Sequence, residues 1–306
     1  MTIRGIPLRQ FVRELNAKIS DDNVFNGAAA LGFYLTLAIF PAMILLMGLI
    51  PFLPIPRVDM AIMDLLKQAL PADASSMFIK VLEEVMQNQH GGVVSVGALG
   101  TLWAASTGMY AIMQQLNITY DVKEARNFLK ARLVAIGLSL LFGALLLTMF
   151  SLIVLGGVVQ DWIGERYGFS QALLTFFVVL RWVIIVLAIL LTFSLTYYFA
   201  PNVEGQKFAF VTPGGVAATL LLMVASVGFA IYVQNFAEYS AVYGGIGAVV
   251  ALMMWLYIAG LVMLLGSEVN VLVEHHSAQG KQIGERAPGQ PAAEKPNRQA
   301  TPPVRS

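Results

Sequence analysis

The sequence predicts an all-α, polytopic membrane protein with six transmembrane helices and additional amphipathic interfacial helices. Three observations predict this fold: 58% of the residues are hydrophobic and 12% charged, six apolar runs are long, and basic residues alternate between their two sides. A helix needs about 20 apolar residues to cross a bilayer, whereas barrel strands would alternate over about 10 residues. The predicted spans are about residues 28–53, 93–113, 133–159, 172–199, 214–233 and 245–272.

The placement of Lys and Arg predicts the orientation of these spans. Fourteen of the nineteen lie in the N-terminal segment, between runs two and three, between runs four and five, and in the tail, whereas four lie on the other side. Cytoplasmic loops carry the excess of basic residues, so both termini are expected in the cytoplasm. The chain contains no cysteine, which excludes disulfides and thiolate chemistry.

Residues 1–27 are predicted to form a cytoplasmic amphipathic segment. Apolar residues recur at helical spacing over residues 7–20, and the basic residues lie off that stripe. Such a helix either rests on an anionic inner leaflet or packs beneath the bundle, and the pattern favours neither. The stripe consists of Leu8, Phe11, Val12, Leu15 and Ile19.

The first span contains Pro41, which is expected to kink it and is a gate candidate, because proline removes a backbone donor. Two amphipathic stretches separated by Pro71 then predict an extracytoplasmic helical cap over residues 57–90. The cap is either a re-entrant or interfacial hairpin or a small solvated lid without a ligand. The domain from 28 to 274 thus holds six spans and this cap.

Small residues and the tail complete the organisation of the chain. Gly100, Ala104 and Gly108 share one face of the second span, which favours close helix packing within the monomer or, alternatively, a homo-oligomer seam. Residues 275–306 are rich in Pro, Gly, Gln and Ala. This composition predicts a disordered cytoplasmic tail.

Ionisable residues inside predicted spans are the first candidates for function, because burying them in a membrane is costly. Glu268, beside Asn270, is either a carboxylate linked to protons or substrate or a buried acid bonded to a neighbouring helix end. Arg181 lies within the fourth run and either reaches the outer headgroups or captures a lipid phosphate with its guanidinium. The two residues are expected near opposite membrane faces.

Two loops supply further candidates. The cytoplasmic loop after the second span could bind anionic headgroups, although topology alone also explains its basic charge. The predicted loop before the last span is either an outer gate or a structural turn. The headgroup candidates are Asn117, Tyr120, Arg126 and Arg132, and the gate candidates are Glu238, Tyr239, Tyr243 and Gly244.

An ordered series of short motifs adds to this interpretation, and together they resemble the YihY/BrkB family of bacterial inner-membrane proteins. Ser267 and Ala38 depart from that pattern, since the family commonly has Ala and Ser there. The resemblance covers about residues 10–275. The motifs are Asn26–Tyr34 with Phe40-Pro41, Leu116-Asn117 with Tyr120, Tyr197–Asn202, Tyr239–Gly247, Leu252–Tyr257 and Leu265–Asn270.

The resemblance implies a role in envelope integrity in the bacterial inner membrane, and some family members are connected with lipid or lipopolysaccharide-precursor export. An old label, ribonuclease BN, does not suit the residues, because they offer neither a cluster of acids and histidines for a metal nor a basic, aromatic groove for RNA. We therefore expect no enzyme activity, metal, cofactor or nucleic acid. The leading hypothesis is a lipid or amphiphile translocator, and the alternative is a scaffold acting through protein partners.

Overall fold

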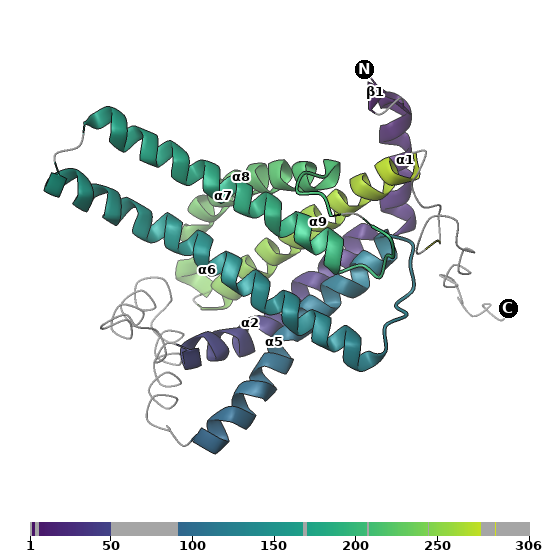
Figure 1. Cartoon of the computed structure of the whole chain (residues 1–306), viewed down its shortest axis with the longest axis horizontal. Helices are drawn as coiled ribbons and strands as arrows, with labels where there is room; N and C mark the ends of the chain where they lie inside the picture. Colours follow the sequence, from purple (N-terminus) through teal and green to yellow (C-terminus); the bar gives the residue numbers. More distant parts are fainter. Residues whose placement is uncertain are drawn as a thin grey trace. The chain divides into compact units, whose positions relative to one another are not determined.

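The structure is a computed structural model that describes residues 2–3, 6–49, 91–167, 170–206, 208–243, 245–276 and 285, and these residues form a helical protein (Figure 1). Apolar residues cover most helices on all sides, which is typical of helices surrounded by lipid or by other helices. The helices are α1 (Leu8–Asp21), α2 (Val24–Leu49), α5 (Gly91–Thr119), α6 (Phe128–Tyr167), α7 (Gln171–Phe199), α8 (Pro213–Tyr243) and α9 (Gly245–His275).

Two short strands precede α1 and are the only strands in the described part of the chain. β1 (Thr2–Ile3) pairs antiparallel with β2 (Ile6–Pro7). Within α1, Phe11 is buried against Leu272 and Val273 of α9, and Leu15 packs on the same cluster. Other residues of the predicted apolar stripe remain exposed, among them Leu8 and Val12. Packing beneath the bundle therefore accounts for part of the stripe.

Four helices are long and apolar enough to cross a membrane. They cover Phe128–Ile153, Gln171–Phe199, Pro213–Val233 and Val249–His275, which correspond to the last four predicted spans. The apolar helix Val24–Ile39 is shorter, and the run predicted at 93–113 lies within α5. The residues that the structure describes therefore show four such helices and not six.

Several predicted boundaries differ from those observed. α8 continues to Tyr243, so the loop expected after residue 233 is helical, and α6 extends from Phe128 to Tyr167 rather than over 133–159. α2 remains helical through Pro41, and the kink there stays a prediction. The predicted cap at 57–90 lies outside the described residues. The same holds for the predicted tail, apart from positions 275, 276 and 285.

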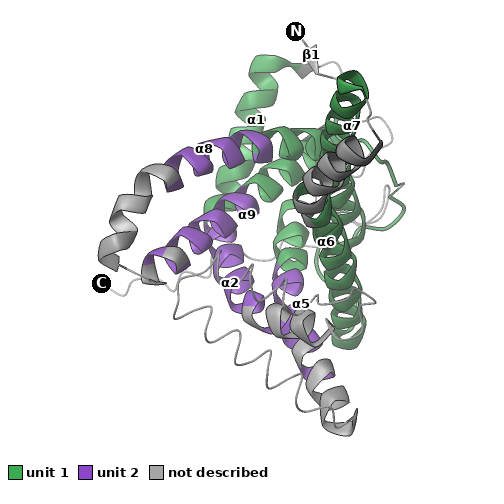
Figure 2. Cartoon of the chain, turned by 90° about the vertical axis from the view of Figure 1, so that its left-hand side faces the viewer, with its two compact units in different colours: residues 1–25, 112–221, 262–306 green, residues 26–111, 222–261 purple. Residues whose placement is uncertain are grey.

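The chain divides into two compact units, shown in green and purple in Figure 2. Unit 1 combines residues 1–25, 112–221 and 262–306, and unit 2 combines residues 26–111 and 222–261. In unit 1, α6 and α7 pack along each other (Figure 1). All candidate residues for headgroup binding, together with Arg181, Glu268 and Asn270, belong to unit 1.

Unit 2 is organised by close contacts at glycines. A Cβ atom on Gly32 of α2 would lie 3.3 Å from the backbone of Tyr257 in α9, and one on Gly260 would lie 3.1 Å from Leu31. Gly108 of α5 similarly faces Leu35 and Ala38 of α2, whereas Gly100 has open space. Small residues thus let α2 approach both neighbouring helices, as close packing within a monomer requires.

Candidate functional site

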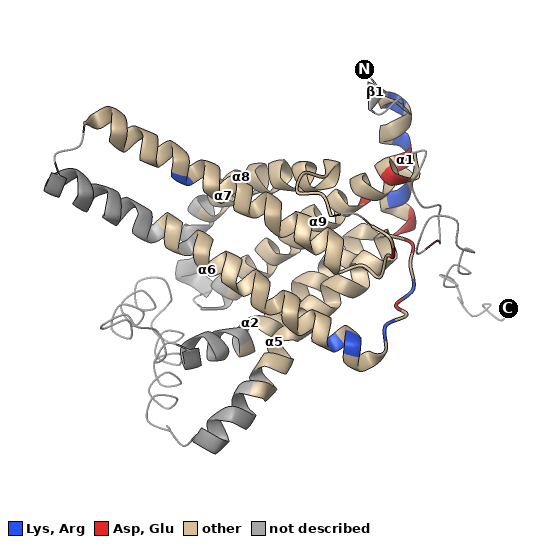
Figure 3. Cartoon of the chain, in the orientation of Figure 1, with Lys and Arg blue, Asp and Glu red and all other residues tan. Residues whose placement is uncertain are grey.

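Charged residues of unit 1 gather on α1, on the segment after α5 and at the start of α6, whereas the described parts of the long apolar helices contain few of them (Figure 3). The centre of this region is the ammonium group of Lys18 on α1. Its Nζ lies 3.2 Å from Asp22 Oδ2, 3.0 Å from Asp121 Oδ2 and 3.4 Å from Glu268 Oε2. We call these four residues the Lys18 cluster.

The Lys18 cluster is almost completely withdrawn from solvent. The side chains of Asp22 and Asp121 are 2% and 6% exposed, and that of Glu268 is 0% exposed. Lys18 and Asp22 are four residues apart, so they share one face of the α1 region. Asp121 adopts a left-handed backbone conformation with φ of 54°, directly after the end of α5. Three separate parts of the chain therefore meet at one buried ammonium.

The electrostatics of the cluster keep Lys18 protonated. Burial lowers the pKa of Lys18, but the negative charges of Glu268, Asp22 and Asp121 raise it by more, so its pKa lies above the usual value. An opposite charge within a few ångströms favours the charged form of a group. The ammonium is therefore a fixed positive charge across the physiological pH range.

Backbone and hydroxyl groups add a second set of contacts around the cluster. Lys18 Nζ donates a hydrogen bond to the carbonyl oxygen of Thr119 at 3.2 Å. The hydroxyl of Ser267 lies 2.9 Å from Thr119 Oγ1 and 2.7 Å from the carbonyl oxygen of Leu264. Ser267, which replaces the alanine expected from the family pattern, thus links α9 to the end of α5.

Arg126 makes a separate network, which we call the Arg126 cap, at the carboxyl end of α7. Its guanidinium donates to the carbonyl oxygens of Ala200 at 3.1 Å, Phe199 at 3.3 Å and Pro201 at 2.8 Å. The last carbonyls of a helix lack partners within the helix and carry partial negative charge, so a cation stabilises them. Glu124 lies 3.8 Å from Arg126 Nε.

Asn117 and Asn202 connect this cap to the end of α5. Asn117 Nδ2 donates to Glu124 Oε2 at 3.0 Å, and Asn117 Oδ1 accepts the backbone N–H of Asn202 at 2.7 Å. Asn202 Nδ2 in turn donates to the carbonyl oxygen of Lys123 at 3.0 Å. Asn117 and Arg126 therefore connect the segment after α5 to the segment after α7.

Asn270 contacts the start of α8. Its Oδ1 accepts the backbone N–H of Gly214 at 2.7 Å, which satisfies one of the unpartnered donors at a helix start. A Cβ atom on Gly214 would overlap the carbonyl oxygen of Gly266, so glycine is required for this approach. The buried phenol of Tyr120 lies within hydrogen-bonding reach of Asn270, and burial raises the pKa of this tyrosine above its usual value.

Arg181 differs from every other predicted site residue. It lies within the apolar helix α7 (Gln171–Phe199), and it is the only basic residue of that helix. Its Nε and Nη1 atoms are buried and have no hydrogen-bond partner in the described part of the chain. A guanidinium carries five N–H donors and keeps its charge, so leaving buried nitrogens without acceptors is unfavourable.

The remaining candidates are Arg132 and the predicted gate residues. Arg132 is buried near the start of α6. The gate candidates Glu238, Tyr239 and Tyr243 have their backbone in α8, and Gly244 lies outside the described residues. Sequence reasoning placed Lys18 only as a topology marker and missed Asp121. The spacing of Lys18 and Asp22 by four residues, directly before an apolar run, was the signal that could have drawn attention to them.

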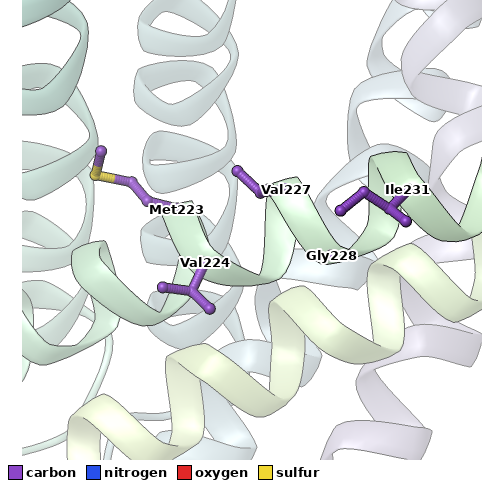
Figure 4. A pocket seen from close by; sticks show the side chains of 5 residues that line it. All are labelled: Met223, Val224, Val227, Gly228 and Ile231. Atoms are coloured by element: carbon purple, nitrogen blue, oxygen red, sulfur yellow. The ribbon is translucent and has the colours of Figure 1, made fainter.

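Two shallow, mainly apolar hollows lie along α8 among the described residues. The one in Figure 4 lies along a single helix, α8, and is lined by Met223, Val224, Val227, Gly228 and Ile231. Val224 is 72% exposed, so this hollow is an open apolar face rather than an enclosed cavity. Among the described residues, no group of three or more His, Cys, Asp or Glu is arranged to hold a metal ion.

Comparison with known proteins gives consistent matches over most of the chain. The family model described as virulence factor BrkB matches residues 16–290. The ribonuclease-like protein YfkH of Bacillus subtilis is 34% identical over 263 residues, covering 86% of this chain and 94% of that protein. A UPF0761 membrane protein of Aeromonas salmonicida is 26% identical over 275 residues, and the alignment covers 85% of this chain and 87% of that protein. No solved structure matches.

Proposed function

This chain belongs to the virulence factor BrkB family of membrane proteins, and on that premise we propose that it binds and translocates a lipid or another amphiphile with an anionic headgroup, without covalent chemistry. We further propose that it is a bacterial inner-membrane protein with six spans and cytoplasmic termini that serves envelope integrity. Single cysteines in this cysteine-free chain test the orientation: one at Glu165 should be labelled from the extracytoplasmic side of the membrane, and one at Ala125 should not.

The observation that carries the proposal is that two buried guanidinium nitrogens of Arg181 in α7, Nε and Nη1, have no hydrogen-bond partner among the described residues. Arg181 is partly exposed, but a cation within an apolar helix requires a compensating anion or a route to water. The planar guanidinium of an arginine can donate two parallel hydrogen bonds to the oxygens of a phosphate, in bidentate geometry. A lipid phosphate brought alongside α7 would supply acceptors that the described protein residues do not.

The surface around Arg181 suits the remainder of such a ligand. Phe176, Trp182 and Val183 are 57%, 52% and 48% exposed, although they lie on the same apolar helix. Exposed apolar side chains of this size are costly in water and favourable beside acyl chains. A headgroup at Arg181 with its chains along α7 therefore satisfies both the charge and the apolar surface.

Reconstitution of the full chain into phosphatidylcholine vesicles tests this proposal. The vesicles contain a small fraction of phosphatidylglycerol with a fluorescent acyl chain, and a membrane-impermeant quencher reports its movement between leaflets. We expect the protein to accelerate this movement, and Arg181→Met to slow it about tenfold, since a charged hydrogen bond contributes about 1.5–3 kcal/mol. Arg181→Lys keeps the charge but loses the planar fork, so an intermediate rate is expected.

Arg13→Met is the matched control, because Arg13 is an exposed arginine on α1. Its rate should equal that of the unmodified chain. Equal rates for Arg181→Met and Arg13→Met would contradict the assignment of Arg181. A chain that moves no lipid, but retains a protein partner through purification, would instead favour the scaffold.

A further inference from the structure

The Lys18 cluster holds three carboxyl groups but only one cation. If Asp22, Asp121 and Glu268 were all ionised, the four side chains would carry a net charge of about −2 in a site where the acids are at most 6% exposed. Excess charge of one sign is costly to bury, and such a group commonly takes up a proton instead. One of the three carboxyl groups is therefore expected to hold a proton.

The hydrogen bonds of Lys18 identify the carboxyl group that is left over. An ammonium has three N–H donors. Three acceptors lie within 3.2 Å of Lys18 Nζ, namely Asp22 Oδ2, Asp121 Oδ2 and the carbonyl oxygen of Thr119. All donors of Lys18 are thus taken, and Glu268 remains at an ion-pair distance of 3.4 Å.

Among the described residues, no other group donates a hydrogen bond to the carboxyl group of Glu268. It is 0% exposed, and neither of its oxygens accepts a hydrogen bond from the residues that the structure describes. Asp22 Oδ2 and Glu268 Oε2 lie 3.2 Å and 3.4 Å from the same Lys18 Nζ atom, so the two carboxyl groups are close neighbours. Two carboxyl groups at such a distance interact favourably when one holds a proton and donates it to the other, and unfavourably when both are ionised.

We propose that Glu268 is a buried proton-binding site, which holds a proton at neutral pH and donates it in a hydrogen bond to Asp22. The ionisable groups that face Glu268 are Lys18 and Asp22 from the α1 region, and Tyr120 and Asp121 from the segment after α5. Tyr120 is neutral, so the balance at the site is set by one cation and two carboxylates. This inference does not depend on lipid translocation.

Loss of the proton would act on α1. The α1 region contacts α9 through two sets of side chains, the apolar contact of Phe11 with Leu272 and Val273 and the charged contact of Lys18 and Asp22 with Glu268. Ionisation of Glu268 would bury a further negative charge in this second set, where it is attracted by Lys18 and repelled by Asp22. The proton on Glu268 therefore avoids burying an additional charge where α1 packs on α9.

Infrared spectroscopy of the full chain in phosphatidylcholine nanodiscs tests the proposal, because a protonated carboxyl group has its own C=O stretching band. We expect this band at neutral pH, from a carboxyl group that exchanges little with water. Glu268→Gln should abolish it, whereas Glu14→Gln should retain it. Glu14 is the matched control, since it lies on α1 with a side chain that is 34% exposed, opposite His276.

Selective labelling keeps the test independent of any variant that fails to fold. Incorporation of ¹³C-carboxyl glutamate, with unlabelled aspartate, should shift the band in the unmodified chain because a glutamate carries the proton. Asp22→Asn removes the neighbouring negative charge, so the band should disappear at a pH lower by about 1–3 units. Asp21→Asn, at the adjacent exposed position, should leave that pH unchanged.

Three results would overturn the proposal. One is the absence of a protonated-carboxyl band at neutral pH in the unmodified chain. The second is a band that does not shift with labelled glutamate, which would place the proton on an aspartate. The third is a folded Glu268→Gln variant whose band equals that of the unmodified chain.

Discussion

The polar end of unit 1 and the middle of α7 both bury cations, but they treat them differently. Lys18 and Arg126 each have three hydrogen-bond acceptors from protein at 3.3 Å or less. Arg181 has buried nitrogens without such acceptors among the described residues. A cation whose acceptors are all supplied by the chain holds the fold together, whereas one without them is available to a ligand. Removing Lys18 or Arg126 should therefore mainly lower stability, whereas removing Arg181 should mainly impair function.

Lys18→Met should have the largest effect on stability. The substitution keeps most of the apolar stem but leaves three buried carboxyl groups without their cation. Breaking a buried ion pair in this way costs about 3–5 kcal/mol of unfolding free energy. Denaturant unfolding in detergent measures the change, and Arg13→Met on the exposed face of α1 should leave stability within about 0.5 kcal/mol. A Lys18→Met variant as stable as that control would show that the cluster does not hold unit 1 together.

Arg126→Ala should have an intermediate effect. The change removes three hydrogen bonds to the last carbonyls of α7, and bonds from charged donors contribute about 1.5–3 kcal/mol. Because the side chain is 13% exposed, water replaces part of what is lost, and we expect the lower end of that range. Hydrogen exchange of the α7 carboxyl end localises the effect. Arg126→Lys should recover only part of the stability, since a point charge cannot reach all three carbonyls.

The difference between the two regions also explains what the sequence could predict. Helices α7 and α9 were placed within a few residues, at 172–199 and 245–272 against Gln171–Phe199 and Gly245–His275, because their apolar runs end at turn-forming or polar residues. The span predicted at 214–233 agrees with the apolar stretch Pro213–Val233, but α8 itself continues to Tyr243, where a loop was expected. Hydropathy marks where a helix leaves an apolar environment, and backbone hydrogen bonding determines where the helix ends.

The candidate site was predictable only where a single residue conflicts with its surroundings. Glu268 and Arg181 were identifiable because a charge within an apolar run is costly wherever it lies. The contact of Lys18 with Glu268 joins residues near the two ends of the chain, and the contact of Arg126 with α7 joins segments far apart in sequence. Such pairings depend on the tertiary packing, and no local spacing encodes them. Only Lys18 with Asp22 has a local signature, the separation by four residues on one helix face.

Arg181→Met should have the smallest effect on stability and the opposite sign from Lys18→Met. The substitution removes a buried charge without protein acceptors and replaces it with an apolar side chain of similar length in an apolar helix. We expect stability in detergent to stay within about 0.5 kcal/mol of the unmodified chain or to rise, because replacing buried charges by apolar residues is often neutral or stabilising. Adding phosphatidylglycerol should stabilise the unmodified chain against thermal unfolding and should stabilise Arg181→Met less, because only a ligand that binds the folded state shifts the transition. A large loss of stability in Arg181→Met without lipid would mean that the guanidinium has a structural partner, and the contrast between the two regions would no longer hold.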